Sequence, residues 1–415
     1  MNSKKLTNFI LGAMILGIMS GYFVYAFGAE SGFSTEYVSY ISLLTDIFLR
    51  LIKMIIAPLV FTTLVVGISR MGDASTIGRV GLKTFGWFIA MSVVSLLLGL
   101  LMVNVLHPGV GINLPLPELT ANTGLSKNGL NLPDFVRHIF PSSIVDAMGK
   151  NEILQIVVFA IFFGVAAGSF GQRAEELIRN LDMLSHIMLK ITTAVMKFAP
   201  VAVFAAVSSV IAENGLAILL TYGKFMLTFY GSILTLWLVI ILISSLVLKK
   251  RAFHLVSMLR QPILLAFTTA SSEAAYPMTL EQVERFGCKN KIASFVLPVG
   301  YSFNLDGSMM YCSFATIFIA QVYSIEMPIS QQLLMLLVLM ITSKGIAGVP
   351  RASLVVIAAT LSQFNLPEAG VLLILGVDHF LDMARSATNV LGNGLATAVI
   401  SKWEGELEHS SILEK

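Results

Sequence analysis

The sequence predicts an all-α polytopic membrane protein, and three observations support this fold class. Of its 415 residues, 56% are hydrophobic and only 12% are charged, with a mean hydropathy of +0.83. A soluble domain carries about twice that charged fraction. Apolar runs of about 18 or more residues recur along the whole chain, as expected of transmembrane helices. The basic residues stand in short clusters between these runs, so they form no face that would bind nucleic acid.

Six ordinary transmembrane helices are predicted before residue 250, at 8–28, 38–70, 77–107, 152–171, 176–212 and 217–248. The apolar stretch of the first exceeds the roughly 7–15 residues of a signal-peptide core, which favours a retained helix over a signal peptide. Segment 107–150 contains several Pro, Asn and Gly residues and is expected to be an aqueous loop. If each helix crosses once, the basic clusters all fall on the side of the N-terminus, which the positive-inside rule predicts to be cytoplasmic.

Two later segments share a different pattern, with short apolar arms on either side of a polar tip. They are 264–280, "LLAFTTASSEAAYPMTL", and 333–361, "LLMLLVLMITSKGIAGVPRASLVVIAATL". Each arm is short for a full span of about 20 residues. Re-entrant helical hairpins satisfy both features, because irregular backbone is tolerated at membrane depth where it faces protein or water. A pair of proline-kinked through-helices is the alternative.

A long helix is predicted after each hairpin, at 293–323 and 369–402, which brings the expected transmembrane helices to eight. The basic loop 285–291 places the first hairpin on the cytoplasmic side. Helix 293–323 then crosses, so the second hairpin enters from outside, and both chain termini are expected in the cytoplasm. Two hairpin-plus-helix units of opposite orientation form an inverted repeat, which points to a binding site near the bilayer midplane.

The helix predicted at 369–402 carries Asp378, Asp382, Arg385, Asn389 and Asn393 at spacings of 4, 3, 4 and 4. All five therefore share one helical face. Ionisable residues within a span are costly and normally face the bundle interior or a wet cavity, so this polar stripe is a candidate binding site. A purely structural ion pair between Asp382 and Arg385 is the alternative, although it does not account for the two asparagines.

The preceding long helix is interrupted within "GYSFNLDGSMMY" by Asn304, Asp306 and Ser308, which follow Gly300. An Asp/Asn pair beside unwound backbone supplies oxygen ligands that suit a hard cation. A polar packing cluster with satisfied hydrogen bonds is the alternative. The cation or proton site is favoured, because an isolated buried carboxyl group would otherwise be neutral and serve no evident purpose.

Four motifs in this region stand in a specific order: "SSEAAYP", "FNLDGS", "SKGIAGVPRAS" and "LDMARSATNVLGN". They resemble the signature motifs of the dicarboxylate/amino acid:cation symporter family, the glutamate transporter homologues, and among these the bacterial proton/sodium glutamate–aspartate symporters. The resemblance covers nearly the whole chain, including 51–68 and 78–83. It implies a homotrimeric secondary symporter of L-glutamate and L-aspartate that works as an elevator in the cytoplasmic (inner) membrane of a bacterium.

The resemblance also implies a division into a scaffold and a moving transport domain. Residues 1–76 would supply scaffold helices 1 and 2, and 108–213 the extracellular loop with scaffold helices 4 and 5. Residues 77–107 would be helix 3 of the transport domain, and 214–415 would complete that domain. Its parts would be helix 6, hairpin 1 at about 252–284, helix 7 at about 293–323, hairpin 2 at about 331–366 and helix 8 at about 369–402.

Carried onto matching positions, the resemblance assigns Arg385 to a side-chain carboxylate and Asp382 to an amino group. The planar guanidinium of arginine suits bidentate recognition of a carboxylate better than a lysine ammonium does. These two charges argue against neutral amino acids and against plain dicarboxylates. The α-carboxylate would be held by Asn389 and by the hairpin serines. The remaining members of the implied substrate-binding set are therefore Asn389, Ser386, Ser308, Ser271, Ser272 and Val349.

The cation site implied by the resemblance departs from the sodium-driven pattern. Asn393 stands where those relatives have an aspartate, and Phe88 and Met91 stand where they have Tyr and Thr. Cys312 replaces the glutamate of potassium-countertransporting relatives, so no such coupling is expected. A degraded cation site remains, made of Asn304, Asp306, Asn393, Gly300 and Ser92.

Glu273 and Arg351 occupy the tips of the two predicted hairpins, at positions where sodium-driven relatives often have serine and glycine. Burial raises the pKa of a carboxyl group, which makes Glu273 a candidate proton carrier. Arg351 is expected to supply the positive charge near the substrate and to pair with Glu273. A merely solvated pair at the tips is the alternative. Proton coupling is therefore predicted, with sodium coupling as the alternative.

Two other classes of membrane protein, an intramembrane protease and an ion channel, share some of these features. Asp306 and Asp382 would be the dyad of an intramembrane aspartyl protease, but "NLDGS" and "LDMAR" do not resemble its motifs, and Arg385 would keep Asp382 ionised. An ion channel would not need an acid and an arginine placed to hold both ends of an amino acid. The expectation is a transporter rather than an enzyme, with no cofactor and no metal apart from sodium, whose partners are its substrate, the lipid bilayer and two further copies of itself.

Overall fold

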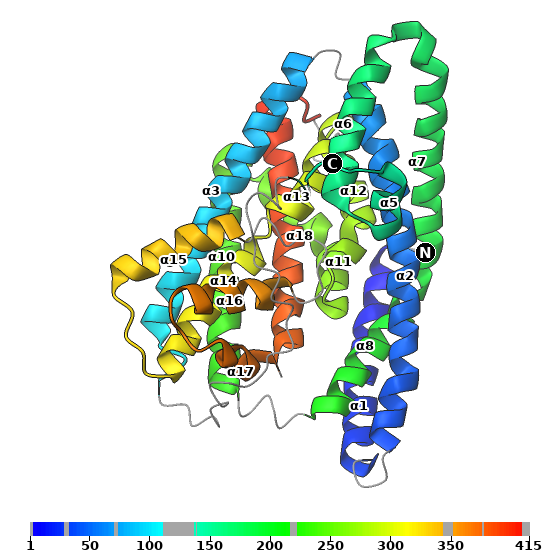
Figure 1. Cartoon of the computed structure of the whole chain (residues 1–415). Helices are drawn as coiled ribbons and strands as arrows, with labels where there is room; N and C mark the ends of the chain where they lie inside the picture. Colours follow the sequence, from blue (N-terminus) through cyan, green and yellow to red (C-terminus); the bar gives the residue numbers. More distant parts are fainter. Residues whose placement is uncertain are drawn as a thin grey trace.

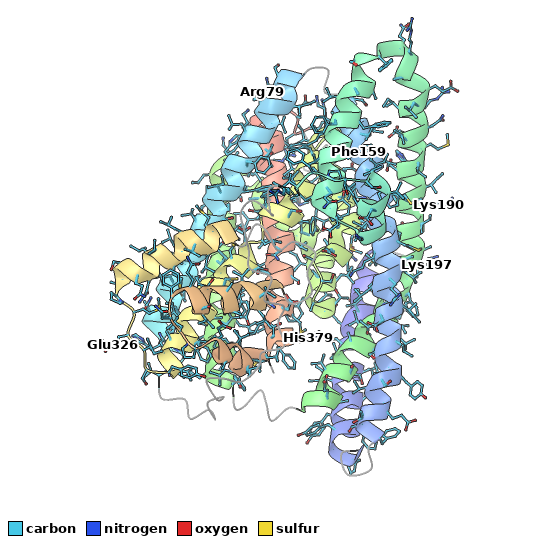
Figure 2. The ribbon with its side chains drawn as sticks, in the orientation of Figure 1. Arg79, Phe159, Lys190, Lys197, Glu326 and His379 are labelled. Atoms are coloured by element: carbon cyan, nitrogen blue, oxygen red, sulfur yellow. The ribbon has the colours of Figure 1, made fainter. Side chains whose placement is uncertain are left out.

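The structure is a computed structural model that describes residues 3–28, 33–69, 74–110, 137, 139–215, 222–342, 352–375 and 377–408. The regular structure of these residues is helical, and an isolated antiparallel bridge pairs Cys288 with Leu407. Figure 1 shows two groups of helices side by side, one along α1, α2, α7 and α8 and the other around α18. The all-helical class predicted from the sequence is confirmed.

The first group consists of long apolar helices that pack along one another. The bounds are α1 (Ser3–Gly28), α2 (Phe33–Ser69), α5 (Ile144–Lys150), α6 (Ile153–Ser169), η1 (Gly171–Ala174), α7 (Glu175–Val195), η2 (Met196–Phe198) and α8 (Ala199–Asn214). α1 lies along α8, and α2 contacts α6, α7 and α8. A Cβ atom on Gly21 would come within 2.5 Å of the carbonyl oxygen of Ser208, so this glycine permits the close crossing of α1 and α8.

The second group surrounds the long C-terminal helix α18 (Asp378–Trp403). The other members are α3 (Ala74–Leu106), α10 (Gly223–Leu248), α11 (Arg251–Thr269), η3 (Glu273–Ala275), α12 (Tyr276–Arg285), α13 (Asn290–Phe303), α14 (Asp306–Val322), α15 (Ile329–Thr342), α16 (Ala352–Gln363), η5 (Glu368–Gly370) and α17 (Val371–Leu375). α18 packs against α10, α11, α13 and α14, which places its polar stripe inside the bundle.

Two of the long helical segments expected from the sequence are divided in the structure. The helix expected at 293–323 is two helices, α13 and α14, separated at Asn304 and Leu305, which confirms the interruption predicted from "FNLDGS". The helix expected at 176–212 lies within the helical span Gly171–Glu213, in which the 3₁₀ turn η2 separates α7 from α8. Pro200, at the start of α8, lacks the N–H that would continue the α-helical ladder.

The two predicted hairpins differ in how much of each lies within the described residues. α11 ends at Thr269, and the next residue, Ala270, has a left-handed φ of 48°. The chain then turns through η3 into α12, which packs back on α11. α15 and α16 likewise contact each other. The predicted tip between them, including Val349 and Arg351, lies outside the described residues.

Within the described part, five helices are long and apolar enough to cross a membrane: Asn8–Phe27, Phe33–Ser69, Ser75–Leu106, Gly171–Glu213 and Gly223–Leu248. Shorter apolar helices occur at Ile153–Ser169, Ile329–Met340 and Ser353–Gln363. The break between α13 and α14 and the polar stripe of α18 keep these later elements outside this set.

Residues 404–408, which we call the C-terminal clasp, tie together several helix ends of the second group. Glu404 binds Arg79 at 3.0 Å and Lys83 at 2.6 Å, both at the start of α3. Glu406 forms ion pairs with Lys289 and Lys291, before and within the first turn of α13. The backbone of the clasp also pairs with the chain between α12 and α13, and it accepts a hydrogen bond from Arg251 at the start of α11.

Candidate functional site

Arg385 is the centre of the polar stripe on α18. Its side chain is 2% exposed and sits among apolar helices. Its Nη2 atom lies 3.1 Å from Oδ1 of Asp378 and 3.0 Å from Oδ1 of Asp382. The ion pair between Asp382 and Arg385 that the sequence suggested is therefore present, and a second carboxylate shares the same nitrogen.

Tyr311 of α14 covers the arginine from a neighbouring helix. The guanidinium carbon lies 4.1 Å from the centre of the Tyr311 ring, a cation–π arrangement. The Tyr311 hydroxyl also donates a hydrogen bond of 3.0 Å to Oδ1 of Asp378. Arginine, tyrosine and aspartate thus form a closed set of contacts between α14 and α18.

Two nitrogen atoms of Arg385, Nε and Nη1, are buried and have no hydrogen-bond partner among the described residues. Buried donors of a charged group that lack partners are costly, by about 1–3 kcal/mol or more. The guanidinium therefore retains donors for an anionic group such as a carboxylate. Asp382, whose side chain is 40% exposed, is the accessible acid of the set.

The next turn of the stripe meets the start of α14. Asn389 accepts a 2.9 Å hydrogen bond from the backbone N–H of Gly307 through Oδ1, and its Nδ2 donates to Ser308 Oγ over 3.4 Å. A Cβ atom on Gly307 would come within 2.6 Å of the Arg385 carbonyl oxygen, so glycine permits this approach. Ser386, also assigned to the substrate from sequence, is buried on α18 between Arg385 and Asn389.

The turn at 270–273 carries the other candidates from the first hairpin. Ser271 Oγ accepts a hydrogen bond from the backbone N–H of Ala274, and within the described residues neither Ser271 nor Ser272 is hydrogen-bonded to the stripe on α18. Glu273 is half-buried at the start of η3, which contacts α2. Lys53 of α2 and Glu152 lie within electrostatic reach of its carboxyl group.

The cation-site candidates meet where α13 ends. Asn304, Asp306 and Asn393 are all fully buried. The Asn304 Nδ2 group donates to Asp306 Oδ2 at 3.1 Å and to Asn393 Oδ1 at 3.2 Å. Ser95 of α3 donates to Asp306 Oδ1 at 3.3 Å. The cluster predicted from the sequence is thus assembled, with amide hydrogens on two of its oxygens.

The packing around this cluster is close. A Cβ atom on Gly300 would come within 2.2 Å of Asn393 Oδ1 and 3.3 Å of the Phe88 ring. Phe88 and Met91 are buried on α3, as is Ser92, the remaining candidate from that helix. The Asn393 amide and the Phe88 ring therefore both lie against the backbone at Gly300.

Sequence reasoning missed the roles of three residues. Asp378 was recognised as part of the stripe, and its spacing of seven from Arg385, two helical turns, was a usable signal. Tyr311 and Ser95 gave no such signal, because their contacts join separate helices. In each of these inter-helix contacts, the two partners lie more than 60 residues apart along the chain.

Fold and site together define a polytopic membrane protein that holds a cluster of charged residues inside its helix bundle. The sequence profile of the Sodium:dicarboxylate symporter family matches residues 6–403, and the chain belongs to this family. It is therefore a membrane transporter and not an enzyme, which excludes the protease alternative.

Three curated relatives match almost the full length of the chain. A "Proton/sodium-glutamate symport protein" of Geobacillus stearothermophilus is 38% identical over 95% of this chain and 93% of that protein. A "Proton/glutamate-aspartate symporter" of Escherichia coli (strain K12) is 39% identical over 97% and 94%. A "C4-dicarboxylate transport protein" of Bacillus subtilis (strain 168) is 36% identical over 99% and 96%.

Proposed function

We propose that this chain is a secondary active symporter that takes up L-glutamate and L-aspartate together with protons. The observation that carries the proposal is the buried Arg385, which has two unpartnered donors in the described structure and lies beside the accessible Asp382. The free donors suit the side-chain carboxylate of an acidic amino acid, and Asp382 suits its ammonium group. Asn389, with Ser271 and Ser272 of the first hairpin, would hold the α-carboxylate, and Ser386, Ser308 and Val349 would complete the substrate-binding set.

The charges of the site favour an amino acid over a C4-dicarboxylate, the substrate class named for the Bacillus subtilis relative. Asp378 and Asp382 outweigh Arg385, which gives the three residues a formal charge of about −1 before any substrate binds. A dicarboxylate would bring about two more negative charges and leave Asp382 without a cation to bind. An acidic amino acid brings one net negative charge and an ammonium group for Asp382.

Proton coupling is supported by the state of the cation cluster. The Asn304 amide hydrogens already bind Asp306 and Asn393, and Phe88 stands beside Gly300. These contacts occupy Asp306 Oδ2 and Asn393 Oδ1 and leave Asn304 Oδ1 as a buried oxygen without a partner among the described residues. A sodium ion needs several such oxygen ligands. Glu273 is the proposed proton carrier, with Arg351 as its expected partner in the loaded state. Sodium coupling through Asn304, Asp306 and backbone carbonyls is the alternative.

The architecture proposed from the sequence explains how the binding site would be carried across the membrane. Eight transmembrane helices and two re-entrant hairpins would form inverted repeats, with α1, α2 and α6–α8 as scaffold and α3 and α10–α18 as the transport domain. The most extensive packing within each group, α1 against α8 and α3 against α14, supports that division, and α13 joins the two groups through its contacts with α2 and α6. The protein would be a homotrimer in the cytoplasmic membrane of a bacterium, with both termini in the cytoplasm, and would alternate access as an elevator.

The test is uptake of labelled L-glutamate, L-aspartate and succinate into liposomes that contain the purified protein. A proton gradient in sodium-free buffer and a sodium gradient without a pH difference are imposed separately. Accumulation of both amino acids on the proton gradient is expected. Accumulation only with sodium would overturn proton coupling, uptake of succinate alone would overturn the substrate, and equilibration without accumulation would indicate a channel.

A further inference from the structure

We propose that Glu406 of the C-terminal clasp is a positioning residue, which anchors the start of α13 and thereby sets the place of Asn304 in the cation cluster. That cluster is the set of buried residues Asn304, Asp306 and Asn393. The inference rests on the proposed function, in which the cluster lies beside the substrate site and bears on the choice of coupling ion. α13 is held by the clasp at one end and by the cluster at the other.

The clasp holds the first turn of α13 through side chains and backbone together. One carboxylate binds two lysines, Lys289 through Oε2 of Glu406 at 2.6 Å and Lys291 through Oε1. The backbone N–H of Lys289 donates to the carbonyl oxygen of Glu406, and that of Glu408 donates to the carbonyl oxygen of Gly287 at 2.9 Å. Gly287 has a φ of 112°, and a Cβ atom there would come within 2.8 Å of the Glu408 carbonyl oxygen, so glycine permits this pairing.

The middle of α13 is held by packing. Its residues Ile292–Ser302 are buried, the Ser294 hydroxyl donates to a carbonyl oxygen of α13 itself, and the Tyr301 hydroxyl has no partner among the described residues. Apolar packing is non-directional, so it opposes a small slide along the helix axis less than it opposes separation of the helices. Lys291 and Asn304 are about 20 Å apart along α13. The directed contacts at these two ends therefore determine where the helix lies along its axis.

The clasp has a fixed base at the end of α18. Glu404, which is almost completely buried, binds Arg79 and Lys83 of α3, and Lys83 also donates to the carbonyl oxygen of Trp403 at 3.1 Å. The Trp403 ring meets that of Trp87 of α3 edge-on, with 5.6 Å between the ring centroids. The ends of α3 and α18 are thus joined, and Glu406 holds α13 against this joined pair.

The far end of α13 meets the substrate site. The Asn304 amide donates to Asp306 and to Asn393 of α18, at 3.1 and 3.2 Å. The residue after Asp306, Gly307, donates its backbone N–H to Asn389, which the proposed function assigns to the substrate. Hydrogen bonds tolerate only a few tenths of an ångström in length. A slide of α13 would therefore disturb the cluster first and the partner of Asn389 next.

The first experiment measures amide hydrogen exchange in the purified protein without substrate, in wild type, Glu406→Lys and Glu406→Gln. Charge reversal sets three lysines together, so exchange at the break between α13 and α14, in residues 300–308, should accelerate at least about fivefold. Glu406→Gln should shift it less in the same direction, and this variant decides the matter if the reversed one does not fold. Exchange in α10 should stay unchanged. Acceleration confined to 285–292 and 404–408 would overturn the inference.

The second experiment measures KM and kcat for L-aspartate uptake in proteoliposomes. Glu406→Lys should raise KM about three- to tenfold and change kcat by less than about twofold, because substrate binding is what changes. Adding Lys289→Glu and Lys291→Glu restores opposite charges and should return KM to within about twofold of wild type. The matched control is Glu281→Lys, which breaks an exposed pair with Arg285 on α12 and should leave both constants unchanged.

The outcomes separate this inference from the proposed function. An unchanged KM in Glu406→Lys would overturn the inference, as would a charge-restored variant that remains as impaired as Glu406→Lys. A raised kcat with unchanged KM would show that the clasp restrains movement and does not position the cluster. If the wild type transports no acidic amino acid, the proposed function fails, whereas hydrogen exchange at 300–308 still decides whether Glu406 sets the position of α13.

Discussion

Asp382 and Arg385 lie one turn apart on α18 and are joined by an ion pair of 3.0 Å, yet their side chains are 40% and 2% exposed. The pair is thus open on its acidic side and closed on its basic side. A ligand that enters through the open side meets the carboxylate before it meets the arginine. This order suits a molecule with an ammonium group close to one carboxylate and a second carboxylate further along.

Arg385→Ala should abolish uptake of L-glutamate and L-aspartate, lowering kcat/KM by at least about a hundredfold, because a buried bidentate donor is lost. Uptake into proteoliposomes checks this. Arg285→Ala is the control, since Arg285 forms an exposed pair with Glu281 on α12 and should leave uptake unchanged. Wild-type uptake in Arg385→Ala would show that the substrate carboxylate binds elsewhere.

Asp382→Asn should lower kcat/KM for the acidic amino acids nearly as far, because the amide cannot balance the substrate ammonium group. Inhibition of residual uptake by succinate should become relatively stronger, since one negative charge has left the site. Competition assays with labelled L-aspartate measure both effects. An Asp382→Asn protein that retains wild-type selectivity between aspartate and succinate would remove this residue from substrate recognition.

Glu273→Gln should impair uptake driven by a proton gradient and spare the exchange of internal for external L-aspartate. The amide keeps the size of the side chain but cannot carry a proton. Net uptake and exchange are measured in the same proteoliposome preparation. Ser272→Ala, at the adjacent position, should affect the two activities equally. If proton-driven uptake survives in Glu273→Gln, another group carries the proton.

Gly392→Ala should destabilise the protein by about 1–3 kcal/mol, as overpacked cores do. The added Cβ would come within 2.1 Å of Asp306 Oδ2, an oxygen that accepts a hydrogen bond from Asn304. The matched control is Gly86→Ala on α3, where a Cβ meets no heavy atom within 4 Å and alanine favours the helix. Thermal unfolding in detergent compares the two, and equal stability of both variants would contradict the packing described at Gly392.

Glu406→Gln should weaken the C-terminal clasp at neutral pH and have no effect in acid. Hydrogen bonds from Lys289 and then Lys291 hold the pKa of Glu406 below its ordinary value of 4.5. A lowered carboxyl pKa stabilises the folded state above pH 4.5, and this contribution is lost as the pH falls through the lowered pKa. The groups are partly solvated, so a fall in Tm of about 1 °C at pH 7 is expected. A difference that persists at pH 3 would exclude the ionised carboxylate as the cause.

Much of the site was visible in the sequence because its members share one helix. The spacing of polar residues on α18 gave the stripe, and "FNLDGS" gave the break between α13 and α14, since both signals are local. The 3₁₀ turn between α7 and α8 left no signal in the sequence, because the apolar composition continues through Met196–Phe198.

Contacts between distant parts of the chain escaped the sequence for a different reason. In the sequence, Tyr311 cannot be distinguished from the apolar residues of α14. Only the packing of α14 on α18 brings its ring over Arg385. Arg79 was recognised as part of a basic cluster, but its partner Glu404 is 325 residues away, and no periodicity links them. Opposite charge limits which residues can form an ion pair, but the fold determines which of the many acidic residues lies beside Arg79.

Because of the C-terminal clasp, the carboxyl end of the described chain is a suitable place for a fluorescent label. A fluorophore at position 408 would be tethered through Gly287 and Arg251 to the helices around α18, whereas one at the exposed His186 would ride on α7. Energy transfer between these two dyes would register any sliding of one helix group past the other. Such a signal could be followed in single molecules in real time.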